Sequence, residues 1–402
     1  MSYLPHQIEK SDDLYKVLAG RKLAMLWGSP RSGKTRTAIR VAEISKANRI
    51  LVITKKAAIS GIQKELEAVS ATKHYTVTNY EQCKKLKADD FDFCIVDESH
   101  NLNKVGKMSQ RFKDVRAITF NKPCLLLSGT PAVEALTAIY YQLAISRYSP
   151  FSHFKSFYEF FRAYGIPNPM WIAGRAIEQY KKAKDTLAPA LEPYVVRMTQ
   201  EDAGISCHAQ DKVHIVRLSE ATKALIDRAK SNGVLHINGE LVALESDMAA
   251  RSAIHQIESG ALLVDEELVE LDNSEVVDYL RANFSGNVAL MAHYRSTRQK
   301  LARYLPDWDI YSSDGNAEGV DLSHYDHFVI VNSGFSGAKF IQRRERVVNI
   351  NRETEAIVHH IVTDGGISAD VYDAVSNKRD YNLRMFRNDR ARNTKEDFEL
   401  VG

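Results

Sequence analysis

An eight-residue segment, GSPRSGKT at positions 28–35, has the composition and spacing that phosphate binding requires. It fits the pattern G-x-x-x-x-G-K-[ST], follows an apolar run and opens a helix-like stretch, which is the context that this motif needs. Gly28 and Gly33 let backbone N–H groups close around phosphate oxygens, and Lys34 can reach the terminal phosphates. The hydroxyl of Thr35 is a ligand for Mg²⁺. The sequence therefore predicts a nucleoside triphosphate site built from Gly28, Ser29, Pro30, Arg31, Ser32, Gly33, Lys34 and Thr35.

Two adjacent carboxylates, Asp97 and Glu98, follow a second apolar run in FDFCIVDESH (91–100). In a parallel sheet they emerge at the same edge as the phosphate loop. We expect Asp97 to hold Mg²⁺ through its water shell and Glu98 to polarise the attacking water. Without the phosphate loop, an ordinary acidic turn after a strand would be the better interpretation. His100 fits two roles, a link from this site to another lobe or a structural hydrogen bond.

A third apolar run ends in small hydroxyl residues, in LLLSGTP at 125–131. Ser128 and Thr130 at a strand end can relay hydrogen bonds from the γ-phosphate site to neighbouring elements. By itself, this segment indicates only a turn.

In order and spacing, GSPRSGKT, DESH and SGTP resemble motifs I, II and III of the superfamily-two helicases. LPHQ (4–7) resembles the segment whose glutamine reads the adenine edge in that superfamily, which implies this role for Gln7. TNYEQ (78–82), beginning with Thr78, is similar to a motif that contacts single strands. Lys55 and Lys56 follow the apolar run RILVIT, where the family touches DNA phosphates. As exposed lysines, they could equally serve solubility.

Later segments resemble the Swi/Snf branch of DNA translocases, namely EPYVVRMTQEDAG (192–204), NVALMAHYRSTRQKLARYL (287–305), EGVDLS (318–323), QRRER (342–346) and GGISADVYDAVSNK (365–378). QRRER is similar to motif VI, which supplies an arginine finger to the γ-phosphate from the second lobe. The resemblance implies catalytic roles for Gln342, Arg343 and Arg346, with Arg346 as the finger.

Three departures from the family pattern concern the second lobe. Asn349 stands where the last motif VI arginine is usual, and Arg344 or Arg352 could substitute for it. Asp321 stands where the Swi/Snf branch usually has asparagine. The short interval 305–319 predicts a trimmed lobe that lacks one strand and a basic segment of the family.

The hydrophobic pattern indicates the elements that would position these motifs. Between 22 and 135, five apolar runs alternate with helix-like stretches, which is typical of βαβ units and a parallel sheet covered on both faces. The hydrophobic pattern is mainly helical from about 133 to 212. Residues 274–333 again alternate between apolar runs and helix-like stretches. We therefore predict an α/β protein of two tandem RecA-like lobes. The first lobe is 1–212 with a helical insertion at 136–212, and the second is 213–402 with linker helices.

Composition bounds the possible functions. The 402 residues carry a net charge of +3, which by itself is poor support for a nucleic-acid partner. Charge is concentrated locally, with a net charge of +4 over residues 339–352 and +5 over residues 378–395. The second cluster is the better candidate for contacts to the DNA backbone. We expect a soluble, cytoplasmic protein, because no apolar run is long enough for a membrane span and four scattered cysteines form no C-x-x-C pair. We also expect it to be a monomer.

Five aromatic residues at near-helical spacing, Phe151, Phe154, Tyr158, Phe161 and Tyr164, could stack nucleobases or pack a helical insert. Packing is the more frequent use of such a pattern.

The resemblance implies an ATPase that uses ATP and Mg²⁺ and moves on or remodels DNA through backbone contacts, as a helicase or translocase. A bacterial cell or a virus-infected host cell would be its setting. Two alternatives remain at this stage, an RNA helicase and a nucleotide-gated nucleic-acid clamp with slow hydrolysis.

Overall fold

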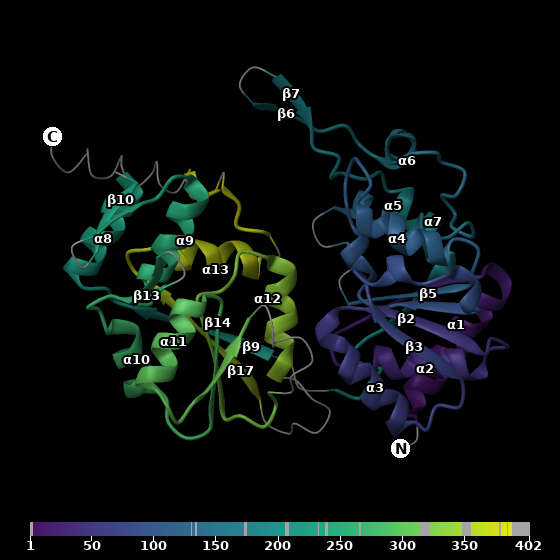
Figure 1. The fold of residues 1–402 in the computed structure, drawn as a ribbon, viewed down its shortest axis with the longest axis horizontal. Coiled ribbons are helices and arrows are strands. Elements are labelled where there is room, and N and C mark those ends of the chain that lie inside the picture. The colour runs from purple at the N-terminus through teal and green to yellow at the C-terminus, as the bar shows by residue number, and fades with distance from the viewer. Residues whose placement is uncertain are drawn as a thin grey trace. The chain divides into compact units, whose positions relative to one another are not determined.

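The computed structural model describes most of the chain, namely residues 3–129, 131–132, 135–172, 175–205, 209–231, 233–237, 240–264, 267–313, 322–347, 355–377, 379–383 and 385–387. The chain divides into two compact units, Met1–Ser206 and Cys207–Gly402 (Figure 1). Each unit is built around a parallel sheet with helices on both faces, as the sequence predicts for two tandem RecA-like lobes.

The sheet of unit 1 has the strand order β3-β2-β4-β5-β1-β8, and all its neighbouring strands pair in parallel. The order is not sequential, so helices must cross over between strands, which places the carboxyl ends of all strands at one edge. The strands are β1 (Leu23–Gly28), β2 (Arg49–Thr54), β3 (His74–Asn79), β4 (Phe93–Val96), β5 (Cys124–Ser128) and β8 (Val195–Met198).

Helices cover both faces of this sheet because side chains of each strand alternate between two cores. Leu23 and Met25 of β1 belong to one core, with α4 to α7, whereas Ala24 and Leu26 belong to the other, with α1 to α3. The helices are α1 (Pro5–Arg21), α2 (Lys34–Ile44), α3 (Ile59–Ala68), α4 (Gln110–Thr119), α5 (Tyr140–Leu143), α6 (Phe157–Tyr164) and α7 (Leu187–Leu191). Short 3-10 turns are η1 (Lys56–Ala58), η2 (Cys83–Lys85), η3 (Ala88–Asp90), η4 (Ser99–Leu102), η5 (Leu136–Ile139) and η6 (Glu192–Tyr194).

The region 136–212, expected to be mainly helical, is more mixed than its pattern suggests. Its helices are short, and a hairpin of β6 (Pro169–Ile172) and β7 (Arg175–Glu178) extends from them. β8 then returns to the main sheet beside β1. Four-residue strands such as VVRM carry too little alternation to be told from helix by period alone.

The sheet of unit 2 has the order β15-β14-β16-β17-β9, again with parallel pairs. Its strands are β9 (Ala209–Val216), β14 (Val288–Ala292), β15 (Asp309–Ser312), β16 (His327–Val331) and β17 (Ala356–Thr363). Two hairpins join β10 (Val234–Ile237) to β11 (Glu240–Ala243) and β12 (Ala261–Val264) to β13 (Glu267–Glu270). The helices are α8 (Glu220–Ser231), α9 (Asp247–Ile257), α10 (Glu275–Asn283), α11 (Arg295–Tyr304), α12 (Gly337–Arg344) and α13 (Ser368–Ser376), and η7 (Glu345–Val347) is a 3-10 turn.

The structure divides the chain at 206/207, whereas the boundary expected from the sequence, 212/213, lies inside β9. β9 begins at Ala209 and pairs along its whole length with β17, so the second unit begins before residue 213. The region 213–265 contains the two helices α8 and α9 but also the hairpin β10–β11 and strand β12. In the short interval 305–319, the described residues contain one strand, β15.

Candidate nucleotide-binding and hydrolysis site

The phosphate loop connects β1 to α2, as the sequence predicts. Gly33 has φ +91° and forms the N-cap of α2, a conformation that favours glycine. The ammonium Nζ of Lys34 donates to the carbonyl oxygens of Gly28 at 2.9 Å and Ser29 at 3.1 Å. A Cβ on Gly28 would lie 2.5 Å from Lys34 Cγ, so this position needs glycine. The loop and the first turn of α2 therefore present backbone N–H groups where a phosphate would bind.

Gln7 packs against this loop. Its side chain is 4% exposed, and its Oε1 accepts the backbone N–H of Leu4 at 3.0 Å. A Cβ on Gly33 would lie only 2.4 Å from Gln7 Nε2, so the amide sits directly on the loop backbone. The neighbouring His6, which sequence reasoning missed, places Nε2 3.0 Å from the carbonyl oxygen of Ser32. The sequence feature that could have identified His6 is its position directly before Gln7 in LPHQ.

Asp97 lies just beyond the end of β4 and is 8% exposed. Thr54 donates its hydroxyl to Asp97 Oδ2 at 2.7 Å, and Tyr80 donates its hydroxyl to the Asp97 carbonyl at 2.6 Å. Burial raises the pKa of Asp97 to about 6, and the adjacent charge of Glu98 adds to this effect. A buried carboxylate whose charge is disfavoured is suited to a cation, and Thr35 stands in the first turn of α2. These donors fit Mg²⁺.

Glu98 connects the second motif to the third. It has φ +49°, and its Oε2 lies 3.2 Å from Nδ1 of His100. The same Nδ1 lies 3.0 Å from the hydroxyl of Ser128 at the end of β5. His100 therefore makes structural contacts inside unit 1, the second of the two roles considered from sequence. A Cβ on Gly129 would lie 3.5 Å from Lys34 Nζ, which brings the third motif beside the phosphate loop.

Gln142 of α5 ties these motifs to the helices behind them, and sequence reasoning missed it. Its side chain is fully buried, and its Oε1 accepts the hydroxyl of Ser99 at 2.7 Å. Its Nε2 lies 2.6 Å from both Asn103 Oδ1 and the Pro131 carbonyl oxygen. One amide thus joins the second motif to the third.

The segment 192–204 supports the phosphate loop from the other side. The backbone N–H of Ser29 donates to the Met198 carbonyl at 2.8 Å. Nε2 of Gln200 donates to the Pro30 carbonyl at 3.3 Å. The end of β8 and the residues after it therefore pack against the phosphate loop.

The QRRER segment of unit 2 forms the end of α12 and the turn η7. Arg343 is 2% exposed and donates from Nε to the Ser313 carbonyl at 3.1 Å. Arg344 pairs with Asp211 of β9 at 2.8 Å, so it holds the sheet of its own unit. Gln342 and Arg346 are half-buried. Asn349, Arg352 and residues 318–321 lie outside the described residues.

The residues expected to contact nucleic acid differ in accessibility. Lys56 is exposed and Lys55 half-buried around the start of η1, whereas Thr78 is only 9% exposed on β3. The Thr78 side chain therefore offers little surface to a nucleic acid. In the aromatic stripe, Phe151 and Phe161 are buried, and Tyr158 is 43% exposed. Packing is thus the use of most of this stripe.

Comparison with known proteins places the chain in a family. A family model described as the SNF2-related domain matches residues 31–262, more than half of the chain. No curated protein matches it. Among solved structures, the SWI2/SNF2 ATPase core domain of Sulfolobus solfataricus is similar at a TM-score of 0.44 and 12% identity, over 94% of this chain and 89% of that chain. In the described part of the chain, no helix is both long and apolar enough to span a membrane. The chain belongs to the SNF2-related family, a family of DNA-dependent ATPases.

Proposed function

We propose that this protein is a DNA-stimulated ATPase that moves on or remodels DNA. The observation that carries the proposal is the convergence of three motifs in unit 1. Lys34 lies beside Gly129, the Glu98 carboxylate contacts His100, and His100 contacts Ser128. This arrangement suits hydrolysis of a triphosphate, because a phosphate-binding cation and a carboxylate for the attacking water adjoin one sheet edge.

In the proposed reaction, Lys34 and the loop N–H groups bind the phosphates, and Gln7 reads the adenine. Thr35 and Asp97 would hold Mg²⁺, which neutralises phosphate charge when bound. Glu98 orients water toward the γ-phosphate. Arg346 of unit 2 supplies the arginine finger, so turnover requires both units. Its half-buried side chain favours it over Arg343, which is buried and bonded to Ser313.

DNA is the proposed partner, bound mainly through its phosphates. The candidate contacts to DNA phosphates are Lys55, Lys56 and the basic stretch 378–395. Most of that stretch lies outside the described residues. Phosphate contacts of this kind predict that DNA affinity falls steeply with salt.

The experiment is an ATP turnover assay with single-stranded, duplex and forked DNA and with RNA, at two salt concentrations. We expect stimulation by at least one DNA form and less by RNA. Absence of stimulation by any DNA would refute the proposal, and stronger stimulation by RNA would favour the RNA helicase. Very slow turnover, together with tight DNA binding in the presence of a non-hydrolysable nucleotide, would favour the nucleotide-gated clamp. The motivation for this alternative is Asn349, which stands where the last motif VI arginine is usual.

A further inference from the structure

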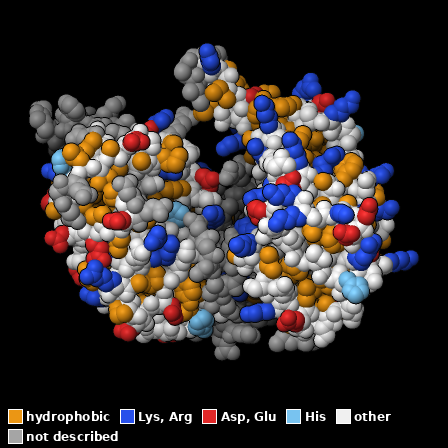
Figure 2. All heavy atoms as spheres, viewed as in Figure 1, with side chains coloured by type: hydrophobic (Ala, Val, Ile, Leu, Met, Phe, Trp, Pro, Cys, Tyr) orange, Lys and Arg blue, Asp and Glu red, His pale blue; other side chains and the backbone are white. Residues whose placement is uncertain are grey.

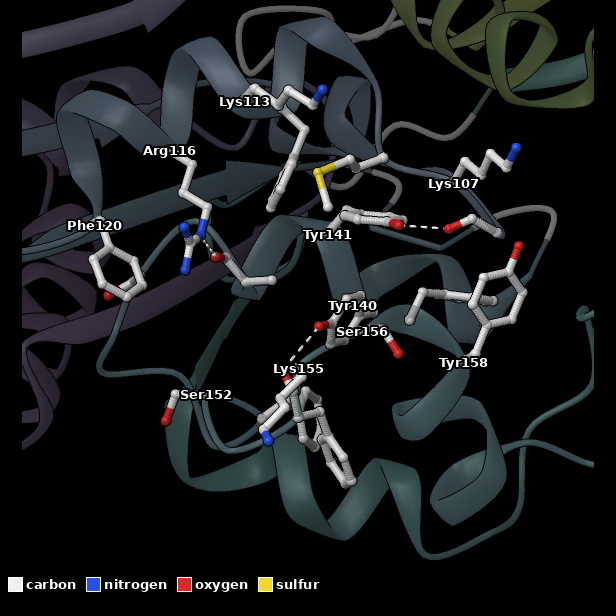
Figure 3. A pocket seen from close by; sticks show the side chains of 18 of the residues that line it. Lys107, Lys113, Arg116, Phe120, Tyr140, Tyr141, Ser152, Lys155, Ser156 and Tyr158 are labelled. Atoms are coloured by element: carbon white, nitrogen blue, oxygen red, sulfur yellow. Dashed lines mark hydrogen bonds between the residues drawn. The ribbon is translucent and has the colours of Figure 1, made fainter.

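A cavity of about 810 Å³ lies in unit 1 between α4, α5 and the start of α6 (Figure 3). Its volume is in the range of pockets that bind ligands. None of its lining residues belongs to the nucleotide site described above. Two of them are large apolar side chains open to solvent, because Met108 is 50% exposed and Tyr158 is 43% exposed. Exposed apolar surface beside a cavity is typical of a binding site.

The deeper wall is aromatic, and its rings cover one another. Tyr141 is stacked with Phe157 at 5.9 Å between ring centroids, and it forms a T-shaped pair with Phe112 at 4.9 Å. Tyr140 is stacked with Phe160 at 4.9 Å. These five rings are at most 5% exposed, so little of any ring face is left for a nucleobase to stack on. The wall therefore favours an apolar side chain that packs against ring edges.

The hydroxyl groups of this wall bond to the protein itself. The hydroxyl of Tyr141 donates to the Gly106 carbonyl at 2.5 Å, and the hydroxyl of Tyr140 donates to the Phe154 carbonyl at 3.3 Å (Figure 3). A nucleobase in the cavity would therefore bury polar edge atoms without these donors, which costs free energy. An aromatic or aliphatic side chain has no such polar edge.

The border of the cavity is cationic. Lys107, Lys113, Arg116 and Lys155 line it with exposed side chains, and among the described lining residues there is no aspartate or glutamate. The nearby Glu159 accepts the backbone N–H of Lys155 at 2.9 Å rather than its ammonium. Lysine and arginine side chains are numerous on the face of unit 1 that Figure 2 shows. The border therefore favours an anionic ligand.

A ligand that complements both surfaces carries an apolar group and several negative charges. We propose that this cavity is a docking site for a short acidic segment of a partner protein, with one aromatic or aliphatic side chain in the cavity and carboxylates on its border. Lys113 comes from α4 and Lys155 from the segment before α6, and in Figure 3 they lie on opposite sides of Tyr140. The segment should therefore have carboxylates on both sides of its apolar anchor.

Peptide selection tests this proposal without ATP or DNA, so its outcome is independent of the proposed enzymatic function. Random dodecapeptides displayed on phage are selected on the full chain, and phage that also bind the Lys113→Glu, Lys155→Glu double variant are removed. We expect the enriched peptides to contain a phenylalanine, tryptophan or leucine with aspartate or glutamate on both sides.

Charge reversal then identifies the binding surface. The probe is the most enriched peptide, synthesised with a fluorescent label and titrated with the full chain. Lys113→Glu with Lys155→Glu should weaken its binding about tenfold. Lys46→Glu with Lys64→Glu makes the same charge change at exposed lysines outside the cavity and should leave binding unchanged.

Two exposed methionines test the apolar part of the site. Met108→Ala removes apolar surface from the cavity lining and should weaken peptide binding about fivefold. Met248→Ala is the matched control, because this methionine is 58% exposed on α9 of unit 2 and does not line the cavity. All these substitutions are at exposed positions, so each variant should keep the unfolding temperature of the wild type, measured alongside.

Four results would overturn the proposal. The first is a selection that enriches no acidic peptide. The second is equal weakening by the two double charge reversals, which would indicate nonspecific attraction. The third is equal affinity of the peptide for Met108→Ala and Met248→Ala. The fourth is displacement of the peptide by a dT12 oligonucleotide together with loss of dT12 binding in Lys113→Glu with Lys155→Glu, which would assign the cavity to nucleic acid.

Discussion

In the proposed site, Lys34 is the residue on which we expect nucleotide binding to depend most. Its ammonium lies between the carbonyls of the phosphate loop and the backbone of Gly129, where the terminal phosphates would bind. We expect Lys34→Ala to lower ATP turnover by about 100- to 1000-fold and to weaken ATP binding. Lys64→Ala, an exposed lysine on α3, is the matched control. Wild-type turnover in Lys34→Ala would refute the assignment of the loop.

We expect Asp97 to make Mg²⁺ binding sensitive to pH, in a direction that follows from the surroundings of its carboxylate. Burial raises its pKa to about 6, and the hydrogen bond from Thr54 opposes this by stabilising the charged carboxylate. Mg²⁺ binds the charged form, so affinity for Mg²⁺ and ATP should fall as the pH drops through that pKa. Thr54→Val removes the hydrogen bond and raises the pKa further. The affinity loss should then begin at a pH about one unit higher.

The measurement is the affinity for Mg²⁺ and a non-hydrolysable nucleotide across pH 5 to 8. Thr76→Val is the control, since Thr76 is an exposed residue of β3. A midpoint that does not move in Thr54→Val would show that this hydroxyl does not control the carboxylate.

Among the elements, we expect α5 to affect hydrolysis through Gln142, which contacts the second and third motifs. Gln142→Ala would leave the Ser99 hydroxyl and the Asn103 amide oxygen without their partner in a buried site. We expect a loss of about 1–3 kcal/mol in the free energy of unfolding, and turnover lowered several-fold with ATP affinity retained. Urea unfolding and steady-state kinetics measure these effects. Gln110→Ala is the control, because the side-chain amide of this exposed residue donates to Asp114 of its own helix. Unchanged turnover in Gln142→Ala would separate α5 from catalysis.

The helices and strands also show which parts of the fold and of the candidate site could be predicted from sequence patterns. The strands that carry the motifs were predictable, because apolar runs such as RILVIT are buried on both faces of a parallel sheet. The phosphate loop and Asp97 were predictable because their neighbours in sequence are also their neighbours in space. Thr54, Tyr80 and Gln142 were not, since each meets its partner from at least 11 positions away. The predicted boundary at 212/213 falls inside β9, because the partner of this strand, β17, lies far along the chain.

At the scale of the whole molecule, the net charge of +3 says little about DNA. Basic residues are concentrated in the stretches 339–352 and 378–395, which sum to +4 and +5. A charge sum over the chain averages them with the acidic residues elsewhere. The salt dependence of DNA binding therefore reports on such local stretches and not on the net charge.

Arg346, the proposed arginine finger, belongs to unit 2, so its substitution tests whether hydrolysis depends on that unit. An arginine finger stabilises charge that develops only in the transition state, so its loss should slow turnover while ATP still binds. We expect Arg346→Ala to lower kcat by about 1000-fold, with ATP affinity within a few-fold of the wild type. Arg344→Ala is the matched comparison in the same segment: its guanidinium pairs with Asp211, so it should lower the stability of unit 2 rather than kcat. Single-turnover kinetics and thermal unfolding distinguish these effects. Normal kcat in Arg346→Ala together with a 1000-fold loss in Arg344→Ala would transfer the finger to Arg344.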